Sequence, residues 1–78
     1  MKRMPTTKQL EVERQELVGA FASARKDAGL TRLEVVGMTK LGLQTLIRIE
    51  AGGAGTGLAN MQVALAAVGL KLKAVPRD

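Results

Sequence analysis

The 78-residue chain contains no cysteine, no histidine, no tryptophan and no tyrosine. Without cysteine or histidine it cannot form disulfides, thiolate or imidazole metal sites, or the usual catalytic triads. No pair of its titratable groups stands at a recognisable catalytic spacing either. We therefore expect no enzyme, no metal and no cofactor.

Long apolar runs are also missing. Lys2 and Arg3 give the chain a charged start similar to that of a signal peptide, but no apolar run of the required length follows. No stretch is long enough to span a bilayer, so we expect no membrane association and a cytoplasmic location.

The residues that are present favour one small domain with an anionic partner. Apolar side chains make up 46% of the chain, and at this length a lone core is marginal, so oligomerisation often helps. Twelve basic against seven acidic residues give a formal net charge of +5, which favours a polyanion such as DNA.

Two helix starts stand about eleven residues apart in the middle of the chain. Thr31 and Glu34 form a capping box, in which each side chain bonds the other residue's backbone amide. Leu41 before Gly42 and Leu46 after it repeat a helix-start pattern, although glycine has no side chain with which to cap. The sequence therefore predicts a helix, a tight turn and a second helix.

The spacing of apolar residues gives each of these two helices a core side. Val35, Val36 and Thr39 share one side of the first helix, and Leu46 and Ile49 share one side of the second. The opposite side of the second helix is expected to face outward, and it carries Gly42, Leu43, Gln44, Ile47 and Arg48.

Two further helices are expected around this pair. The first runs from a cap at Thr6 or Thr7 to a stop at Gly29, and its apolar stripe consists of Leu10, Leu17, Phe21 and Ala24. The other runs from Leu58 to Val68, with Thr56 as a candidate cap, Gly69 as its stop and an apolar face made of Leu58, Met61, Leu65 and Val68.

The glycine-rich run at 52–57 has the GxGxG spacing of some nucleotide-binding loops. A phosphate-binding loop follows a strand and ends in Lys-Ser or Lys-Thr, whereas here a helix precedes and Leu58-Ala59 follows. We interpret the run as a flexible connection.

Both ends of the chain lie outside the helical pattern. Residues 1–6 form a basic arm, which is either a frayed terminus, the interpretation that we favour, or a segment that lies along a DNA backbone or minor groove. Residues 70–76 alternate apolar and basic side chains, as a half-buried strand does, until Pro76 ends the pattern.

A lone strand is not stable, and the sequence shows no second one. The simplest partner is the same strand of a second copy, which gives a two-fold sheet; the alternative is a frayed tail whose lysines only add charge. The expected dimerising residues are Leu70, Leu72, Ala74 and Val75.

Several of these motifs together resemble the phage-repressor and Cro-type (XRE) helix-turn-helix family. The matching stretches are Leu30-Thr31-x-x-Glu34, the Leu41 to Gly42 turn and Ile49-Glu50-x-Gly52, in a register without gaps. Residues 24–30 and 58–69 are similar to that family's first and fourth helices, and residues 70–76 resemble the terminal strand of HipB-type antitoxin regulators. The resemblance covers roughly residues 8–76.

The resemblance implies an all-α, four- to five-helix, lambda-repressor-like domain. On this expectation the flexible arm spans 1–6, the DNA-binding domain 7–69 and the dimerising strand 70–76. The implied function is that of a bacterial homodimeric repressor, an antitoxin-like autoregulator that binds double-stranded DNA at an inverted repeat and also binds a toxin protein. Arg25 and Glu50 match residues that pair across the domain in the family; the alternative is that both are solvated.

The outward helix is the expected DNA-reading surface. Gln44 suits adenine, Arg48 suits guanine, and aliphatic side chains suit thymine methyl groups, while Arg32 suits a phosphate. The expected DNA-binding residues are Arg32, Lys40, Gly42, Leu43, Gln44, Thr45, Ile47 and Arg48.

Two features depart from the family pattern. Lys40 stands where the turn commonly has a glycine at positive φ, so we expect either strain of about 1 kcal/mol or a slightly bent turn. Leu43 and Ile47 replace hydrogen-bonding residues, which leaves open a second hypothesis: a protein-binding patch on a domain with weak or lost DNA binding.

Overall fold

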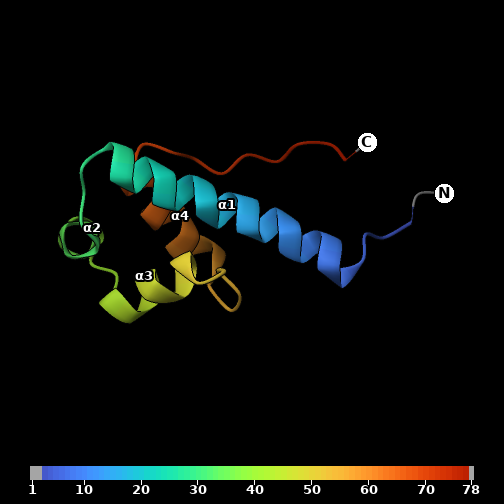
Figure 1. Ribbon diagram of the computed structural model, residues 1–78, viewed down its shortest axis with the longest axis horizontal. Coiled ribbons are helices and arrows are strands. Elements are labelled where there is room, and N and C mark those ends of the chain that lie inside the picture. The colour runs from blue at the N-terminus through green and yellow to red at the C-terminus, as the bar shows by residue number, and fades with distance from the viewer. Residues whose placement is uncertain (1–2, 78) are drawn as a thin grey trace.

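The structure is a computed structural model that describes residues 3–77 and contains four α-helices within that range. They are α1 (Thr7–Asp27), α2 (Arg32–Thr39), α3 (Leu43–Glu50) and α4 (Leu58–Ala67). The shorter helices gather around the carboxyl-terminal half of α1, while its amino-terminal half projects away from them (Figure 1). The expected all-helical fold is confirmed.

Local capping explains where α1 and α2 begin. The Thr6 hydroxyl accepts from the Gln9 amide at 3.1 Å, and the Thr6 amide donates to Gln9 Oε1 at 2.6 Å. Thr31 and Glu34 form the same reciprocal pair, with distances of 3.1 and 2.9 Å. Both boxes satisfy amides that the first turn of a helix otherwise leaves unpaired.

The predicted cap of α4 is wrong by one residue. Gly57 occupies the cap position and makes no side-chain cap bond, while the Thr56 hydroxyl is buried and has no hydrogen-bond partner in the described chain. Gly53 and Gly55 both have positive φ and fold the loop so that the Thr56 amide donates to the Gly53 carbonyl at 3.1 Å. That turn keeps Thr56 out of the cap position.

The core lies where all four helices meet. Phe21, Val35, Leu46, Ile49 and Leu65 are fully buried, which confirms the predicted core sides of α2 and α3. The remaining members of the core cluster are Val18, Met61 and Ala64.

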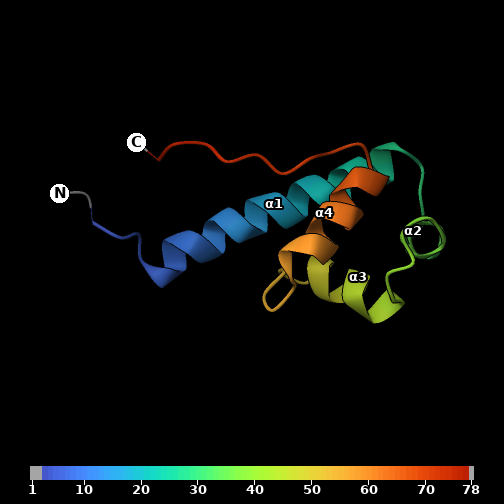
Figure 2. The same cartoon turned by 180° about the vertical axis from the view of Figure 1, so that it is seen from behind.

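The apolar faces of α1 and α4 differ in part from the prediction. Leu58 is 69% exposed, and Ala64 is buried on α4 instead. On α1 the predicted Phe21 is buried together with Val18, which the prediction did not include, whereas Leu10 and Leu17 are only partly buried. Leu10 cannot reach the core because the first half of α1, residues 7–16, lies beyond the other helices (Figure 2).

Residues 70–77 form an extended segment, the C-terminal segment, which returns alongside α1 (Figures 1 and 2). Leu70 and Leu72 are partly buried against the core, and the Arg77 guanidinium forms a two-pronged ion pair with the Glu13 carboxylate. Within residues 3–77 there is no strand, so the strand expected at 70–76 is absent from the single chain. Among the described residues none forms strand hydrogen bonds with residues 71–76, and Leu70 and Leu72 pack on the chain's own helices.

The arm expected over residues 1–6 is described only in part. Met1 and Lys2 lie outside the described residues, and residues 3–5 have no regular structure before Thr6 caps α1. Among the helices described, none is both long enough and apolar enough to cross a membrane.

Candidate nucleic-acid interface

The two sides of α3 differ sharply in exposure. Leu46 and Ile49 are completely buried, while Leu43 and Ile47 are 38% and 39% exposed. The side chains of Gln44 and Arg48 are exposed, Gly42 lies exposed at the helix start, and Thr45 is half-buried. The structure therefore brings Gly42, Leu43, Gln44, Ile47 and Arg48 to one accessible helical surface, with Thr45 at its edge.

The turn before α3 is held by hydrogen bonds of Thr39. Its hydroxyl donates to the Val35 carbonyl at 2.7 Å and accepts from the Leu41 amide at 3.2 Å. Gly42 then takes an extended conformation as the cap, and its carbonyl accepts from Leu46 at 3.2 Å. These bonds fix where α3 starts relative to α2, and so fix which of its sides faces outward.

Lys40 adopts the conformation that glycine usually supplies at this turn. Its φ is 64° and its ψ is 10°, in the left-handed region, and its amide donates to the Val36 carbonyl at 2.9 Å. A non-glycine residue there costs roughly 1 to 2 kcal/mol. The turn therefore keeps its geometry and places an exposed cation beside the start of α3.

Arg25 and Glu50 pair across the domain. Arg25 Nε and Nη2 donate to the two Glu50 carboxylate oxygens at 3.0 and 3.3 Å, and Arg25 Nη1 donates to the Leu30 carbonyl at 2.8 Å. Only 11% of the Arg25 side chain and 9% of the Glu50 side chain are exposed. The pair ties the end of α3 to the end of α1 and to the turn before α2.

Arg32 joins this pair, which the sequence reasoning missed. Arg32 Nη2 donates to Glu50 Oε1 at 3.1 Å, although 48% of its side chain is exposed. Burial raises the pKa of Glu50, but hydrogen bonds from Arg32 and Arg25, with their positive charges, outweigh it and hold that pKa below its usual 4.5. Because Arg32 and Glu50 are far apart in the sequence, no local spacing predicts that they meet.

A shallow hollow of about 520 Å³ lies between α3 and the start of α2. Leu43 and Ile47 from α3 and Leu33 from α2, which is 68% exposed, supply its apolar lining. Arg25 and Arg32 supply the cationic lining. The outward face of α3 is thus continuous with a surface that combines exposed aliphatic groups with guanidinium groups.

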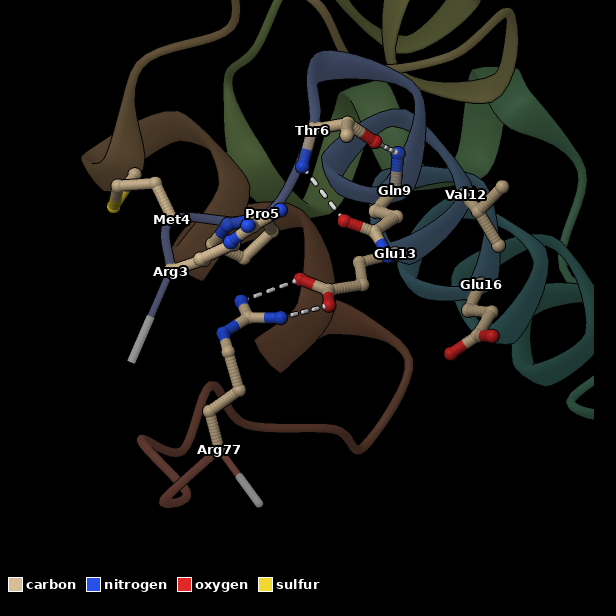
Figure 3. A pocket seen from close by; sticks show the side chains of 9 residues that line it. All are labelled: Arg3, Met4, Pro5, Thr6, Gln9, Val12, Glu13, Glu16 and Arg77. Atoms are coloured by element: carbon tan, nitrogen blue, oxygen red, sulfur yellow. Dashed lines mark hydrogen bonds and ion pairs between the residues drawn. The ribbon is translucent and has the colours of Figure 1, made fainter. Parts of the chain in front are cut away.

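A larger hollow of about 690 Å³ lies at the amino-terminal end of α1, away from α3 (Figure 3). Arg77 reaches it from the C-terminal segment and points at Glu13, beside Arg3 and Thr6 of the arm (Figure 3). The hydrogen bond from Arg77 lowers the pKa of Glu13. The residues that line this hollow come from the two ends of the chain, so no spacing in the sequence connects them.

Within residues 3–77 no group of three or more carboxylates is arranged to hold a metal ion. Comparison of the chain with protein-family models, with curated proteins and with solved structures finds no match. The geometry of α2, α3 and the surfaces around them is therefore what indicates a function.

Proposed function

We propose that this chain is a sequence-specific double-stranded DNA-binding transcriptional regulator of the phage-repressor and Cro type. The observation that carries the proposal is the division of α3 into a wholly buried side, Leu46 and Ile49, and an exposed side with Gln44 and Arg48. A helix held on a rigid core with polar groups outward can enter a major groove. The net charge of +5 favours approach to DNA.

The residues on and around this face have separate roles in the proposal. Gln44 pairs with an adenine and Arg48 with a guanine, while Leu43 and Ile47 pack on thymine methyl groups. Lys40 and the exposed part of Arg32 contact phosphates and set the register without reading sequence. The operator therefore contains both A·T and G·C pairs.

The proposed active form is a homodimer joined through the C-terminal segment. No backbone hydrogen bond connects residues 71–76 to any other part of the described chain, so the amides of residues 71–75 and the carbonyls of residues 71–76 are available to a second copy. Antiparallel pairing of two such segments would bury Ala74 and Val75, which the single chain leaves exposed. Two α3 helices related by that axis would read half-sites about 34 to 36 Å apart.

By the resemblance noted in the sequence, we further propose an antitoxin-like autoregulator of HipB type that acts on the nucleoid in the cytoplasm. Such a protein represses its own promoter by occluding it and also restrains a toxin protein. The pairing of a basic DNA-reading face with a separate dimerising segment is compatible with both roles.

Selection of binding sequences from random duplex DNA tests the proposal. We expect an inverted repeat, and we expect Gln44→Ala to relax the preference at one position of each half-site, with a loss of about 1 to 3 kcal/mol in discrimination. Gln62→Ala makes the same chemical change on an exposed position of α4 and should leave specificity intact. Arg32→Ala should weaken all sequences alike. Equal effects of the Gln44 and Arg32 changes would contradict the assigned roles.

The dimer has its own test. Lys73→Pro removes a backbone donor and should break strand pairing, while the extended segment of a single chain can accept proline. We expect sedimentation equilibrium to show dimers for the wild type and for Lys73→Ala, and monomers for Lys73→Pro. Dimers in all three proteins would contradict pairing through this segment.

A second candidate function is a protein-interaction module, and the hollow beside α3 favours it. Leu33, Leu43 and Ile47 expose aliphatic surface together there, with two arginines around them. A toxin-binding module without DNA affinity would bind its protein partner with little dependence on salt, whereas binding to several phosphates weakens steeply as salt rises.

A further inference from the structure

A cavity of about 260 Å³ lies between α1, the loop that follows α3, the start of α4 and the C-terminal segment. Its lining is largely apolar: Leu17 and Val18 from α1, Leu58 and Met61 from α4, and Leu72 from the C-terminal segment. Since one water occupies about 30 Å³ in the liquid, the cavity has room for on the order of ten non-hydrogen atoms. That is smaller than a typical drug-sized site.

Thr56 is one of the residues that line this cavity. Its oxygen is buried and makes no hydrogen bond within the described chain, because its neighbour Gly57 has taken the cap position of α4. A buried hydroxyl without a partner costs roughly 1 to 3 kcal/mol. A ligand with a hydrogen-bond acceptor would relieve that cost, so Thr56 favours an acceptor.

A cation lines the same cavity. Arg14 of α1 contributes to the lining, and its guanidinium forms no ion pair with a residue in the described range. The nearest carboxylate along the sequence, Glu13, is engaged by Arg77. The Arg14 charge is therefore available to an anion, and guanidinium binds carboxylates with strong, charge-assisted hydrogen bonds.

We propose that this cavity is a binding site for a small aliphatic carboxylate of about eight carbon atoms. The alkyl chain lies against Leu17, Met61 and Leu72, and the carboxylate accepts hydrogen bonds from Arg14 and from the Thr56 hydroxyl. The apolar lining selects a hydrocarbon chain, and the two donors select an anionic acceptor at one end. The proposal is independent of DNA binding, since none of these residues belongs to the outward face of α3.

Gly53 packs closely against two other residues that line the cavity. A Cβ at Gly53 would stand 3.2 Å from Val18 Cγ1 and 3.4 Å from Met61 Cε, so this side of the cavity is closely packed.

Titration of the full-length chain with sodium octanoate, followed by amide NMR shifts, tests the proposal. We expect saturable shifts with one site per chain, concentrated at Gly53, Thr56 and Met61. Octanol has the same chain without the charge and should bind about tenfold more weakly, as expected for the loss of charge-assisted hydrogen bonds.

Matched variants distinguish hydrogen bonds donated by Arg14 and Thr56 from nonspecific attraction of the anion to positive charge. Arg14→Gln should weaken octanoate about tenfold and leave octanol unchanged, and Thr56→Val, which keeps the side-chain shape, should weaken octanoate by several-fold. Lys8→Gln removes the same unit charge from α1 outside the cavity and should have no effect. A thermal unfolding curve that matches that of the wild type would show that each variant remains folded.

Shifts that do not saturate, shifts that map elsewhere, or equal effects of Arg14→Gln and Lys8→Gln would overturn the proposal. Failure of the chain to bind DNA would not, because the titration reads the cavity alone.

Discussion

The segment from Thr31 to Glu50 and the C-terminal segment are held in place by different means. In the first, caps, a left-handed turn and three fully buried side chains all define one geometry. In the second, residues 71–76 make no backbone hydrogen bond within the described chain, and the segment is held by two half-buried leucines and by the Arg77–Glu13 ion pair. The first region is fixed by local caps and by buried contacts with the rest of the domain, whereas much of the second is exposed and has unpaired backbone groups within the described chain.

This difference matches the proposed division of work. A surface that reads bases needs side chains fixed by a rigid support, whereas a segment that joins two copies needs backbone groups that are still unpaired. The predictions that follow compare the two regions by disrupting contacts in each of them.

The largest effect is expected from breaking the buried pair in the first region. Glu50→Ala leaves Arg25, whose side chain is 11% exposed, without its carboxylate, which costs about 3 to 5 kcal/mol for a buried pair. Chemical denaturation monitored by circular dichroism measures the change. The matched change in the second region, Glu13→Ala, breaks an exposed pair and should leave the unfolding midpoint almost unchanged. Equal losses in the two variants would contradict the comparison.

Lowering the pH should reproduce part of the loss of stability expected for Glu50→Ala. Because the pKa of Glu50 is lowered by folding, its stabilising contribution is complete above its usual value of 4.5 and is lost as pH falls through the lower folded pKa. The free energy of unfolding should therefore fall on acidification below about pH 4.5. The difference between wild type and Glu50→Gln should shrink over the same range; a difference that stays constant with pH would contradict the assignment.

Relief of the strained turn should give a smaller effect of opposite sign. Lys40→Gly places glycine at the left-handed position and should raise the free energy of unfolding by about 1 kcal/mol, whereas Lys40→Ala keeps the strain and should not. Both variants remove the same charge, so both should weaken DNA binding equally. If Lys40→Ala were more stable than Lys40→Gly, the left-handed backbone at Lys40 would not be strained.

The smallest effect on folding is expected at the end of the C-terminal segment. Arg77→Gln removes the two-pronged ion pair with Glu13, yet both side chains are about half exposed, so thermal unfolding should hardly change. Release of the segment should instead strengthen association between copies, which sedimentation equilibrium can measure. A large loss of thermal stability without stronger association would show that the segment is a fixed part of the single domain.

The residues from Thr31 to Glu50 predict the structure of α2, α3 and the turn between them well, because their signals are local. The Thr31 and Glu34 box, the start at Gly42 and the core sides of α2 and α3 each depend on residues within two turns of one another. The pairing of Arg25 with Glu50 is a long-range contact, and it was expected from a family resemblance, not from spacing.

Contacts between distant segments, and one turn set by loop glycines, account for what the sequence did not predict. Arg32 reaches Glu50, and Arg77 reaches Glu13, through the folded chain, so neither contact leaves a periodic pattern. Thr56 lost the cap position because glycines in the loop set its turn. The alternation of residues 70–76 predicts a strand, but a strand needs a partner that the single chain does not supply.

The most direct test of the proposed function is the salt dependence of DNA binding, measured by fluorescence anisotropy with a labelled duplex that carries the selected inverted repeat. We expect tight binding at low salt that weakens steeply as salt rises, and a slope that Arg32→Ala reduces by about one phosphate contact. Absence of binding at low salt, or an affinity that does not change with salt, would contradict the proposal that the outward face of α3 reads DNA.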